Sequence, residues 1–124
     1  MVKGLVIIPT YNEAENIATV IKSVLKIMKN VDILIIDDNS QDETRKIVRN
    51  IRRREKRVTM IERQKKLGLG TAYVMGFKYA LSHNYDFVFE MDADLSHDPN
   101  DLPRFVKELN FYDLIIGSRY IKGV

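Results

Sequence analysis

The residues in this sequence best suited to chemistry are two aspartates, Asp92 and Asp94, which come at the end of an apolar run. Side chains alternate across a strand, so carboxylates at positions i and i+2 where a strand ends project to the same side. Two carboxylates that close repel each other, and a hard divalent cation such as Mg²⁺ removes that conflict and usually binds together with a phosphate-bearing substrate. The spacing therefore predicts a metal and phosphate site, although aspartate is also common in loops and helix caps.

The elements that must position these residues are predicted from hydrophobic periodicity. Runs that are apolar throughout predict buried strands at residues 4–9, 32–38, 58–62, 87–92 and 113–117. Amphipathic helices are predicted between them, with inward-facing sets at residues 17, 20, 21, 24, 25 and 28; 47, 48 and 51; 73, 77, 80 and 81; and 102, 105, 106 and 109. Ser40 and Glu43 fit a capping box for the second helix. The alternation predicts an α/β fold, a Rossmann-like and mostly parallel sheet with helices on both faces.

Polar loops follow four of the predicted strands, at residues 9–13, 37–40, 92–97 and 117–120. Ligands of parallel α/β sheets bind beyond the carboxyl ends of the strands, which is where these loops would lie. Together the loops contain an aromatic ring, several carboxylates, the candidate metal pair and an arginine. Those groups match the base, the ribose and the phosphates of a nucleotide, so we expect a nucleotide site at this edge of the sheet.

The composition is that of one ordinary globular domain. The chain has 124 residues, of which 45% are hydrophobic, enough to bury a core. It contains no apolar run of 18 or more residues and no signal-peptide pattern, so neither a membrane span nor a signal peptide is expected within it. The chain has no cysteine, which excludes disulfides and thiolate metal sites and fits an intracellular protein.

Charge is unevenly distributed along the chain, whose formal net charge is +3. Between Arg45 and Lys66 there are eleven basic residues and only two acidic ones, so this segment carries +9 and the remainder carries −6. Such a segment is typical of a solvated helix face. It also fits attraction to an anionic membrane surface or to a phosphate-bearing partner.

Two other phosphate-related classes are excluded by the positions of the motifs. Gly68 and Gly70 match only part of the dinucleotide-binding G-x-G-x-x-G pattern and do not follow the first strand, so we reject NAD binding. A phosphoacceptor receiver domain would have paired acids after its first strand. Here Pro9, Thr10 and Tyr11 occupy that place.

Five segments form a collinear set over nearly the whole chain: PTYNE at 9–13, DDNSQDET at 37–44, KLGLGTAY at 66–73, MDADLSH at 91–97 and GSRY at 117–120. This set closely resembles the family 2 glycosyltransferases of GT-A fold, and the GLGTAY and DADLSH segments favour the dolichol-phosphate mannosyltransferase branch. Asn39 stands where the family often has glycine, a small change because asparagine tolerates left-handed turns. The resemblance implies that residues 1–124 form a single nucleotide-sugar-binding domain.

The resemblance also implies which residues bind the nucleoside. The family positions that match Pro9, Tyr11 and Glu13 line a guanine pocket. Those that match Ile36 and Asp38 help to hold the nucleoside. GDP-mannose is therefore the expected donor.

A second group of matching positions concerns the diphosphate. Asp92, Ala93 and Asp94 match a DXD-type motif that holds Mg²⁺ or Mn²⁺ there, and Ser96 lies close to the metal in the family. Arg119 matches an arginine near the phosphates. We expect Asp94 and Arg119 to act in catalysis, with the metal as Lewis acid for the departing GDP.

The expected reaction is transfer of mannose to a dolichyl or other polyprenyl phosphate, with inversion at the sugar carbon. An acceptor phosphate is already ionised near neutral pH, so positioning and positive charge can replace a catalytic base. We expect an enzyme that is cytoplasmic or peripheral at the cytoplasmic face of a membrane, with no nucleic-acid partner.

The chain stops where family members continue into an acceptor-binding part, so we expect it to be the truncated, donor-binding half of a longer enzyme. Two alternatives stay open from the sequence. One is a family 2 enzyme that uses a UDP-sugar, and the other is a non-catalytic nucleotide-binding module.

Overall fold

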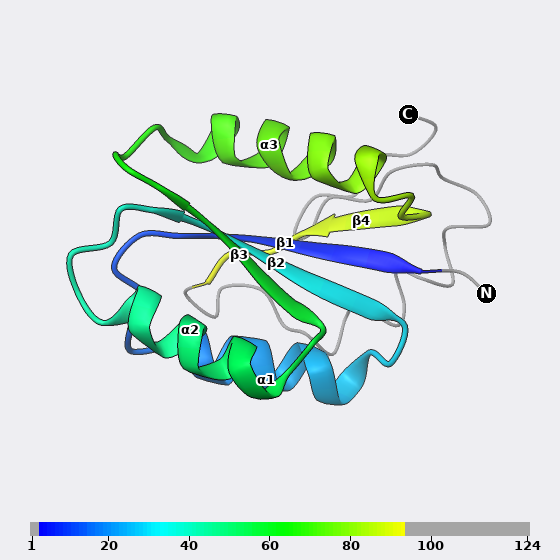
Figure 1. Ribbon diagram of the computed structural model, residues 1–124, viewed down its shortest axis with the longest axis horizontal. Helices are drawn as coiled ribbons and strands as arrows, with labels where there is room; N and C mark the ends of the chain where they lie inside the picture. The colour runs from blue at the N-terminus through cyan, green and yellow to red at the C-terminus, as the bar shows by residue number, and fades with distance from the viewer. Residues whose placement is uncertain (1–2, 94–124) are drawn as a thin grey trace.

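The computed structural model describes residues 3–93, which form a parallel four-stranded sheet with helices on both faces (Figure 1). The strands are β1 (Gly4–Thr10), β2 (Val31–Asp38), β3 (Val58–Arg63) and β4 (Phe87–Glu90). The strands predicted near residues 4–9, 32–38, 58–62 and 87–92 are thereby confirmed. The predicted fourth helix and fifth strand lie outside the described residues.

The order of the strands is β3-β2-β1-β4. β2 and β3 therefore lie on one side of β1, and β4 lies on its other side. Gly4 of β1 is accordingly in register with Val31 of β2 and with Phe87 of β4. The strand order reverses between β1 and β4. In open parallel sheets this reversal is where a crevice for ligands forms, at the carboxyl ends of the strands.

Three helices cover the two faces of the sheet (Figure 1). α1 (Ile17–Ile27) and α2 (Thr44–Arg54) lie on one face, and α3 (Leu69–Ser82) lies on the other. Within residues 3–93, no helix is long and apolar enough to cross a membrane.

Alternation of side chains along β1 divides the core into two layers. Val6 and Ile8 pack with the residues of α1 and α2, whereas Leu5 and Ile7 pack with those of α3. Because β1 has a strand on each side and helices above and below, all four side chains are buried. This environment explains why residues 5–8 of the first strand are all apolar rather than alternately apolar and polar.

The predicted capping box at the start of α2 is wrong. Glu43 stands at the N-cap but makes no side-chain cap hydrogen bond. The Ser40 Oγ instead accepts from the backbone N–H of Asn12 at 2.9 Å, and its hydroxyl donates to Oδ1 of Asp37. Oδ1 of Asp42 accepts from the backbone N–H of Thr44 at 2.9 Å and so binds the first turn of the helix.

The inward face of α3 agrees with the predicted one at Tyr73, Phe77 and Ala80, which are buried or pack against the core, and differs at Leu81. Leu81 was expected to face inward, but it is 80% exposed. Tyr73 and Phe77 are only partly buried, and the buried positions of the helix are the small residues Ala72, Gly76 and Ala80. Small residues let the helix backbone come close to the sheet, and hydrophobic periodicity does not detect a contact made by glycine.

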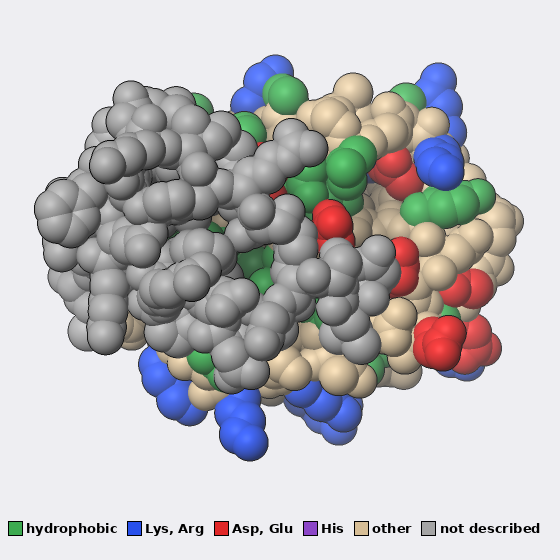
Figure 2. Space-filling model, turned by 180° about the vertical axis from the view of Figure 1, so that it is seen from behind, with side chains coloured by type: hydrophobic (Ala, Val, Ile, Leu, Met, Phe, Trp, Pro, Cys, Tyr) green, Lys and Arg blue, Asp and Glu red, His purple; other side chains and the backbone are tan. Residues whose placement is uncertain are grey.

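The basic segment of residues 45–66 maps to α2, β3 and the loop after β3. Arg57 is used internally, because its guanidinium donates to backbone carbonyls including that of Val31 at 2.9 Å. Several others are exposed or half-exposed, namely Lys46, Arg52, Arg53, Arg54 and Lys56. Figure 2 shows lysine and arginine side chains gathered along the lower edge of the molecule, where Figure 1 places α1 and α2. A role for this basic edge in membrane attraction stays a prediction.

The close approach of α3 to the sheet predicts that Gly76→Ala destabilises the protein. A Cβ at Gly76 would lie 2.6 Å from Cδ1 of Ile7, a fully buried side chain of β1. We expect a loss of about 1–3 kcal/mol in the free energy of unfolding, measured by urea denaturation.

Gly70→Ala is the matched control for this substitution. Gly70 lies in the first turn of the same helix, and a Cβ added there would have no neighbouring atom within 4 Å. The unfolding free energy of this variant should be unchanged or slightly increased, because alanine favours helix over glycine. Equal losses in the two variants would contradict the close contact between α3 and β1.

Candidate nucleotide-binding site

A cleft of about 290 Å³ lies at the carboxyl edge of the sheet, where the strand order reverses. Its walls come from the loops after all four strands and from the start of α3. The lining residues are Pro9, Thr10, Tyr11, Glu13, Asp38, Lys66, Gly68, Leu69, Asp92 and Ala93. The cleft therefore combines an aromatic ring, three carboxylates and one ammonium group in a single space.

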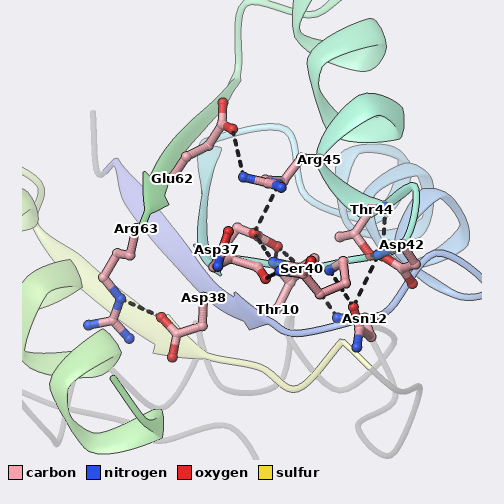
Figure 3. A network of polar contacts seen from close by, with 12 residues as sticks. Thr10, Asn12, Asp37, Asp38, Ser40, Asp42, Thr44, Arg45, Glu62 and Arg63 are labelled. Atoms are coloured by element: carbon pink, nitrogen blue, oxygen red, sulfur yellow. Dashed lines mark hydrogen bonds and ion pairs between the residues drawn. The ribbon is translucent and has the colours of Figure 1, made fainter. Parts of the chain in front are cut away.

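The loop after β1 is held against the loop after β2 by the side chain of Asn12 (Figure 3). Oδ1 of Asn12 accepts from the backbone N–H of Gln41 at 2.8 Å, and the backbone N–H of Asn12 donates to Oγ of Ser40 at 2.9 Å. Asn12 and Asn39 both have positive φ, at 56° and 58°. The expectation that Asn39 serves where a left-handed residue is needed is thus confirmed.

Asp37 lies beneath these loops as a fully buried carboxylate (Figure 3). It accepts hydrogen bonds from the Thr10 hydroxyl at 2.6 Å, and from the hydroxyl and backbone N–H of Ser40 at 2.6 and 2.9 Å. Nε of Arg45 lies 3.8 Å from Oδ2 of Asp37. These contacts join the end of β1 to the end of β2, so Asp37 holds the cleft walls together without lining the cleft.

Arg45 and Arg49 also reach Glu62 of β3, and these ion pairs fix α2 to the edge of the sheet. Nε of Arg49 donates to a Glu62 carboxylate oxygen at 3.0 Å. The hydrogen bond from Arg49 lowers the pKa of Glu62 below its usual value. Part of the basic segment is therefore used to tie the helix to the strand.

Asp38, the second of the two consecutive aspartates, does line the cleft. Its carboxylate forms a buried ion pair with Arg63 of β3 (Figure 3). The same carboxylate accepts from the backbone N–H groups of Leu67 and Gly68, at 3.2 and 2.9 Å. Arg63 in turn donates to the Gly68 carbonyl at 3.0 Å. Asp38 and Arg63 together fix the loop that leads into α3.

This fixed loop places Lys66 over the ring of Tyr11. The Lys66 ammonium lies 4.2 Å from the ring centroid, within cation–π range. Tyr11 is 39% exposed, so its ring forms part of an open wall of the cleft. Gly68, where the loop enters the helix, has φ of 99°, a backbone conformation that favours glycine.

Asp92 lines the cleft from beyond the last residue of β4. β4 was predicted to run to Asp92, but it ends at Glu90. The backbone N–H of the next residue, Met91, still donates to the Ile7 carbonyl of β1 at 3.0 Å. The hydroxyl of Tyr73 donates to Oδ1 of Asp92 at 3.2 Å. Burial, followed by the charges of Asp92 and Glu90, raises the pKa of the Tyr73 hydroxyl well above its usual value.

Most of the predicted site residues that can be placed lie in this one cleft: Pro9, Tyr11, Glu13, Asp38, Asp92 and Ala93. Ile36 does not line it, because its side chain is fully buried in the core beneath α3. Asp94, Ser96 and Arg119 lie outside the described residues.

The sequence interpretation did not single out Lys66, Thr10 or Leu69 as site residues, although all three line the cleft. Lys66 was counted only as a member of the basic segment and of a resembling motif. Lys66 comes just before Gly68 and Gly70, in a loop that follows a strand. That position was the feature of the sequence that could have identified Lys66 as a site residue. The partner of Thr10 is a buried aspartate far away in sequence, so no local pattern could reveal it.

The donor set of the cleft fits a hard divalent cation. Carboxylate oxygens are the ligands that Mg²⁺ and Mn²⁺ prefer, and Asp92 supplies one at the edge of the cleft. Within residues 3–93, no three histidine, cysteine or acidic residues are grouped so that they could hold a metal by themselves. The described part of the chain thus offers a partial ligand set of the kind that phosphate oxygens and water complete.

Comparison with curated proteins identifies relatives over almost the entire chain. The undecaprenyl-phosphate mannosyltransferase of Micrococcus luteus is 40% identical over 119 residues, which cover 96% of this chain and 49% of the relative. The dolichol-phosphate mannosyltransferase of Pyrococcus furiosus is 38% identical over 124 residues, covering 98% of this chain and 34% of the relative. The chain thus spans between a third and a half of the length of these relatives.

A solved structure shows the same fold. The mannosyltransferase PcManGT from Pyrobaculum calidifontis, in complex with GDP-Man and Mn²⁺, superposes with a TM-score of 0.71 at 27% identity. The superposition covers 86% of this chain and 32% of that protein. The expected Rossmann-like sheet of the GT-A glycosyltransferases is therefore confirmed. The family model described as Glycosyl transferase family 2 matches residues 5–124, and the chain accordingly belongs to that family.

Proposed function

We propose that this chain is the donor-binding part of a metal-dependent, inverting glycosyltransferase that moves mannose from GDP-mannose to dolichyl or another polyprenyl phosphate. The observation that carries the proposal is the cleft that Tyr11, Lys66 and Asp92 line together, with the Lys66 ammonium 4.2 Å from the centroid of the Tyr11 ring. The relatives named as mannosyltransferases of polyprenyl phosphates, and the neighbour bound to GDP-Man and Mn²⁺, support it.

The strand order suggests how the donor lies in the cleft. Along the sheet edge the loops follow in the order β3, β2, β1 and β4, and they contribute Lys66, Asp38, Tyr11 and Asp92. Tyr11 and Asp92 follow the adjacent strands β1 and β4, and the Lys66 ammonium reaches the Tyr11 ring from the loop after β3, so one donor can contact all three residues. We place the diphosphate near Asp92 and the guanine near Tyr11 and Lys66.

The remaining nucleoside contacts in the proposal come from the first two strands. Pro9 and Glu13 border the guanine, and Asp38 contacts the nucleoside from the floor of the cleft. Ile36 acts from within the core, since its side chain is fully buried next to the cleft floor. A flat base against the exposed Tyr11 ring would gain apolar contact while its edge stays open to polar groups.

The diphosphate half of the proposed site combines Asp92 and Ala93 with three residues outside the described range. Asp92 and Asp94 would hold Mg²⁺ or Mn²⁺, with Ser96 nearby and Arg119 close to the phosphates. A cation held there supplies Lewis-acid stabilisation of the negative charge that develops on departing GDP. Arg119 adds a permanent positive charge for the same purpose.

The proposed chemistry needs no catalytic base. An ionised oxygen of the acceptor phosphate forms a bond to the anomeric carbon of mannose. The bond from that carbon to the GDP oxygen breaks on the opposite side, and its electron pair leaves with GDP, so the configuration inverts. Catalysis then depends on holding the two phosphates in line and on positive charge at the leaving group.

Because a polyprenyl chain lies in a bilayer, we place the whole enzyme at the cytoplasmic face of a membrane. The exposed basic residues of α2, which include Arg52, Arg53 and Arg54, would be attracted to anionic lipid headgroups. We take residues 1–124 as one domain whose acceptor-binding partner is a further part of the enzyme.

The donor assignment predicts that this chain binds GDP and GDP-mannose more tightly than UDP, and more tightly with Mn²⁺ than with EDTA. We expect Mn²⁺ to increase GDP affinity roughly tenfold, or about 1.4 kcal/mol, because the cation joins a carboxylate to the diphosphate. Isothermal titration calorimetry measures both effects. A preference for UDP would contradict the mannosyl assignment.

Asp92→Asn should abolish the effect of Mn²⁺ on GDP affinity, because an amide is a poorer ligand for a hard cation than a carboxylate. Glu15→Gln is the matched control, since Glu15 is an exposed acid that does not line the cleft. The same calorimetric titrations with and without Mn²⁺ apply. A normal metal effect in Asp92→Asn would contradict its role as a ligand.

Lys66→Met should weaken GDP binding several-fold, because the Lys66 ammonium lines the same cleft and attracts an anionic ligand even from its place beside the proposed guanine position. The loss should shrink as ionic strength rises, since salt screens charges near the surface. Lys65→Met, at the adjacent exposed lysine, should have little effect. GDP affinity is measured for both variants at low and at high salt. Equal losses in Lys66→Met and Lys65→Met would contradict the role given to Lys66.

A further inference from the structure

Tyr73 connects two of the sequence motifs by a hydrogen bond that the proposed donor site does not use. It lies on α3, in the GLGTAY segment, and its hydroxyl donates to Oδ1 of Asp92 in the DADLSH segment at 3.2 Å. The two residues are 19 positions apart in sequence, so only the packing of α3 over the end of β4 brings them together. Tyr73 itself is not among the residues that line the cleft.

The hydroxyl of Tyr73 is not needed to fill the core. Its ring packs against the layer beneath α3, and Phe77, one turn further along, packs against the same layer with no hydroxyl. A partly buried hydroxyl loses contact with water, and that loss is compensated only by a hydrogen bond. Here the acceptor is a carboxylate at the cleft, which makes the bond a charge-assisted one.

Tyr73 gives the Asp92 carboxylate a hydrogen bond from outside the sheet. The ladder bond nearest to it is made by Met91, so the backbone of Asp92 is beyond the regular part of β4. A bond from a side chain anchored in a helix restricts the orientation of its carboxylate. Metal ligands are commonly oriented by such outer partners, and loss of one typically costs about 10–100-fold in metal affinity.

α3 is itself fixed to a second carboxylate that lines the cleft. The backbone N–H of Gly68, at the N-cap of the helix, donates to Asp38 at 2.9 Å, and Tyr73 follows one turn later. The helix therefore contacts both the nucleoside end and the diphosphate end of the cleft through carboxylates. This anchoring gives the Tyr73 hydroxyl a defined position.

We infer that Tyr73 is a positioning residue that holds the Asp92 carboxylate in the orientation in which it binds the divalent cation. The inference rests on the proposed function, because it takes Asp92 as a ligand of the metal that accompanies the nucleoside diphosphate.

The test is titration of Mn²⁺ into the 124-residue chain at saturating GDP, with free Mn²⁺ followed by electron paramagnetic resonance. Tyr73→Phe keeps the ring and removes only the hydroxyl. Tyr85→Phe is the matched control, since the Tyr85 hydroxyl donates to Asp32 at 2.6 Å, and Asp32 lies at the start of β2, the end of the strand remote from the cleft. GDP affinity in EDTA and the midpoint of thermal unfolding are measured for each protein.

We expect the dissociation constant for Mn²⁺ to rise about tenfold in Tyr73→Phe and to stay at the wild-type value in Tyr85→Phe. GDP affinity in EDTA should be the same in all three proteins, and both variants should unfold at somewhat lower temperature than wild type. This pattern separates orientation of the carboxylate from a general loss of stability.

Two outcomes would overturn the inference while leaving the proposed function in place. One is equal Mn²⁺ affinity in Tyr73→Phe and Tyr85→Phe when the wild type binds Mn²⁺ with GDP. The other is a fall in GDP affinity in EDTA that accounts for the whole effect of Tyr73→Phe. A wild-type chain that binds GDP with no Mn²⁺ dependence would instead overturn the proposed metal site, and the role of Tyr73 with it.

Discussion

The buried carboxylate of Asp37 is the constraint on which the shape of the cleft depends. An ion removed from water destabilises the fold by several kcal/mol unless it is paired and hydrogen bonded. The hydroxyls of Thr10 and Ser40 and the guanidinium of Arg45 meet that requirement from three separate elements. Each partner must come to Asp37, so the loop after β1, which carries Tyr11 and Glu13, is held against the loop after β2 before any ligand binds.

Asp37 and Asp38 illustrate how adjacent residues of one type take different roles. Successive side chains of a strand point to opposite faces, so the two carboxylates meet different neighbours. Asp37 meets hydroxyls and Arg45 beneath the loops, whereas Asp38 meets Arg63 and the loop that enters α3. One aspartate therefore fixes the walls near β1, and the other fixes the wall near β3 while remaining at the cleft surface.

The sequence was sufficient to predict the strands and helices of residues 3–93 and the edge of the sheet at which the cleft lies, because burial on both faces makes residues 5–8 of β1 and 33–36 of β2 continuously apolar. It was insufficient where a contact depends on partners distant in sequence. Ser40 was assigned to a helix cap, but its Oγ accepts from the backbone N–H of Asn12, 28 residues away in sequence. Gly76 was left out of the predicted inward face of α3, because hydrophobic periodicity does not detect the close approach of helix and sheet that the lack of a side chain allows. Lys66 reached the cleft only through a loop fixed by Asp38 and Arg63.

The position of β4 beside β1 also has a consequence for the order of folding. Gly4 pairs with Val31 within the first third of the chain, but its pairing with Phe87 must close a loop of more than eighty residues. Closing a long loop carries a larger entropic cost, so contacts distant in sequence form late. The walls made by β1 and β2 can thus assemble early, and the Asp92 end joins them only when β4 docks. During synthesis the nascent chain would carry a nucleoside-facing half-site well before it carries a phosphate-facing one.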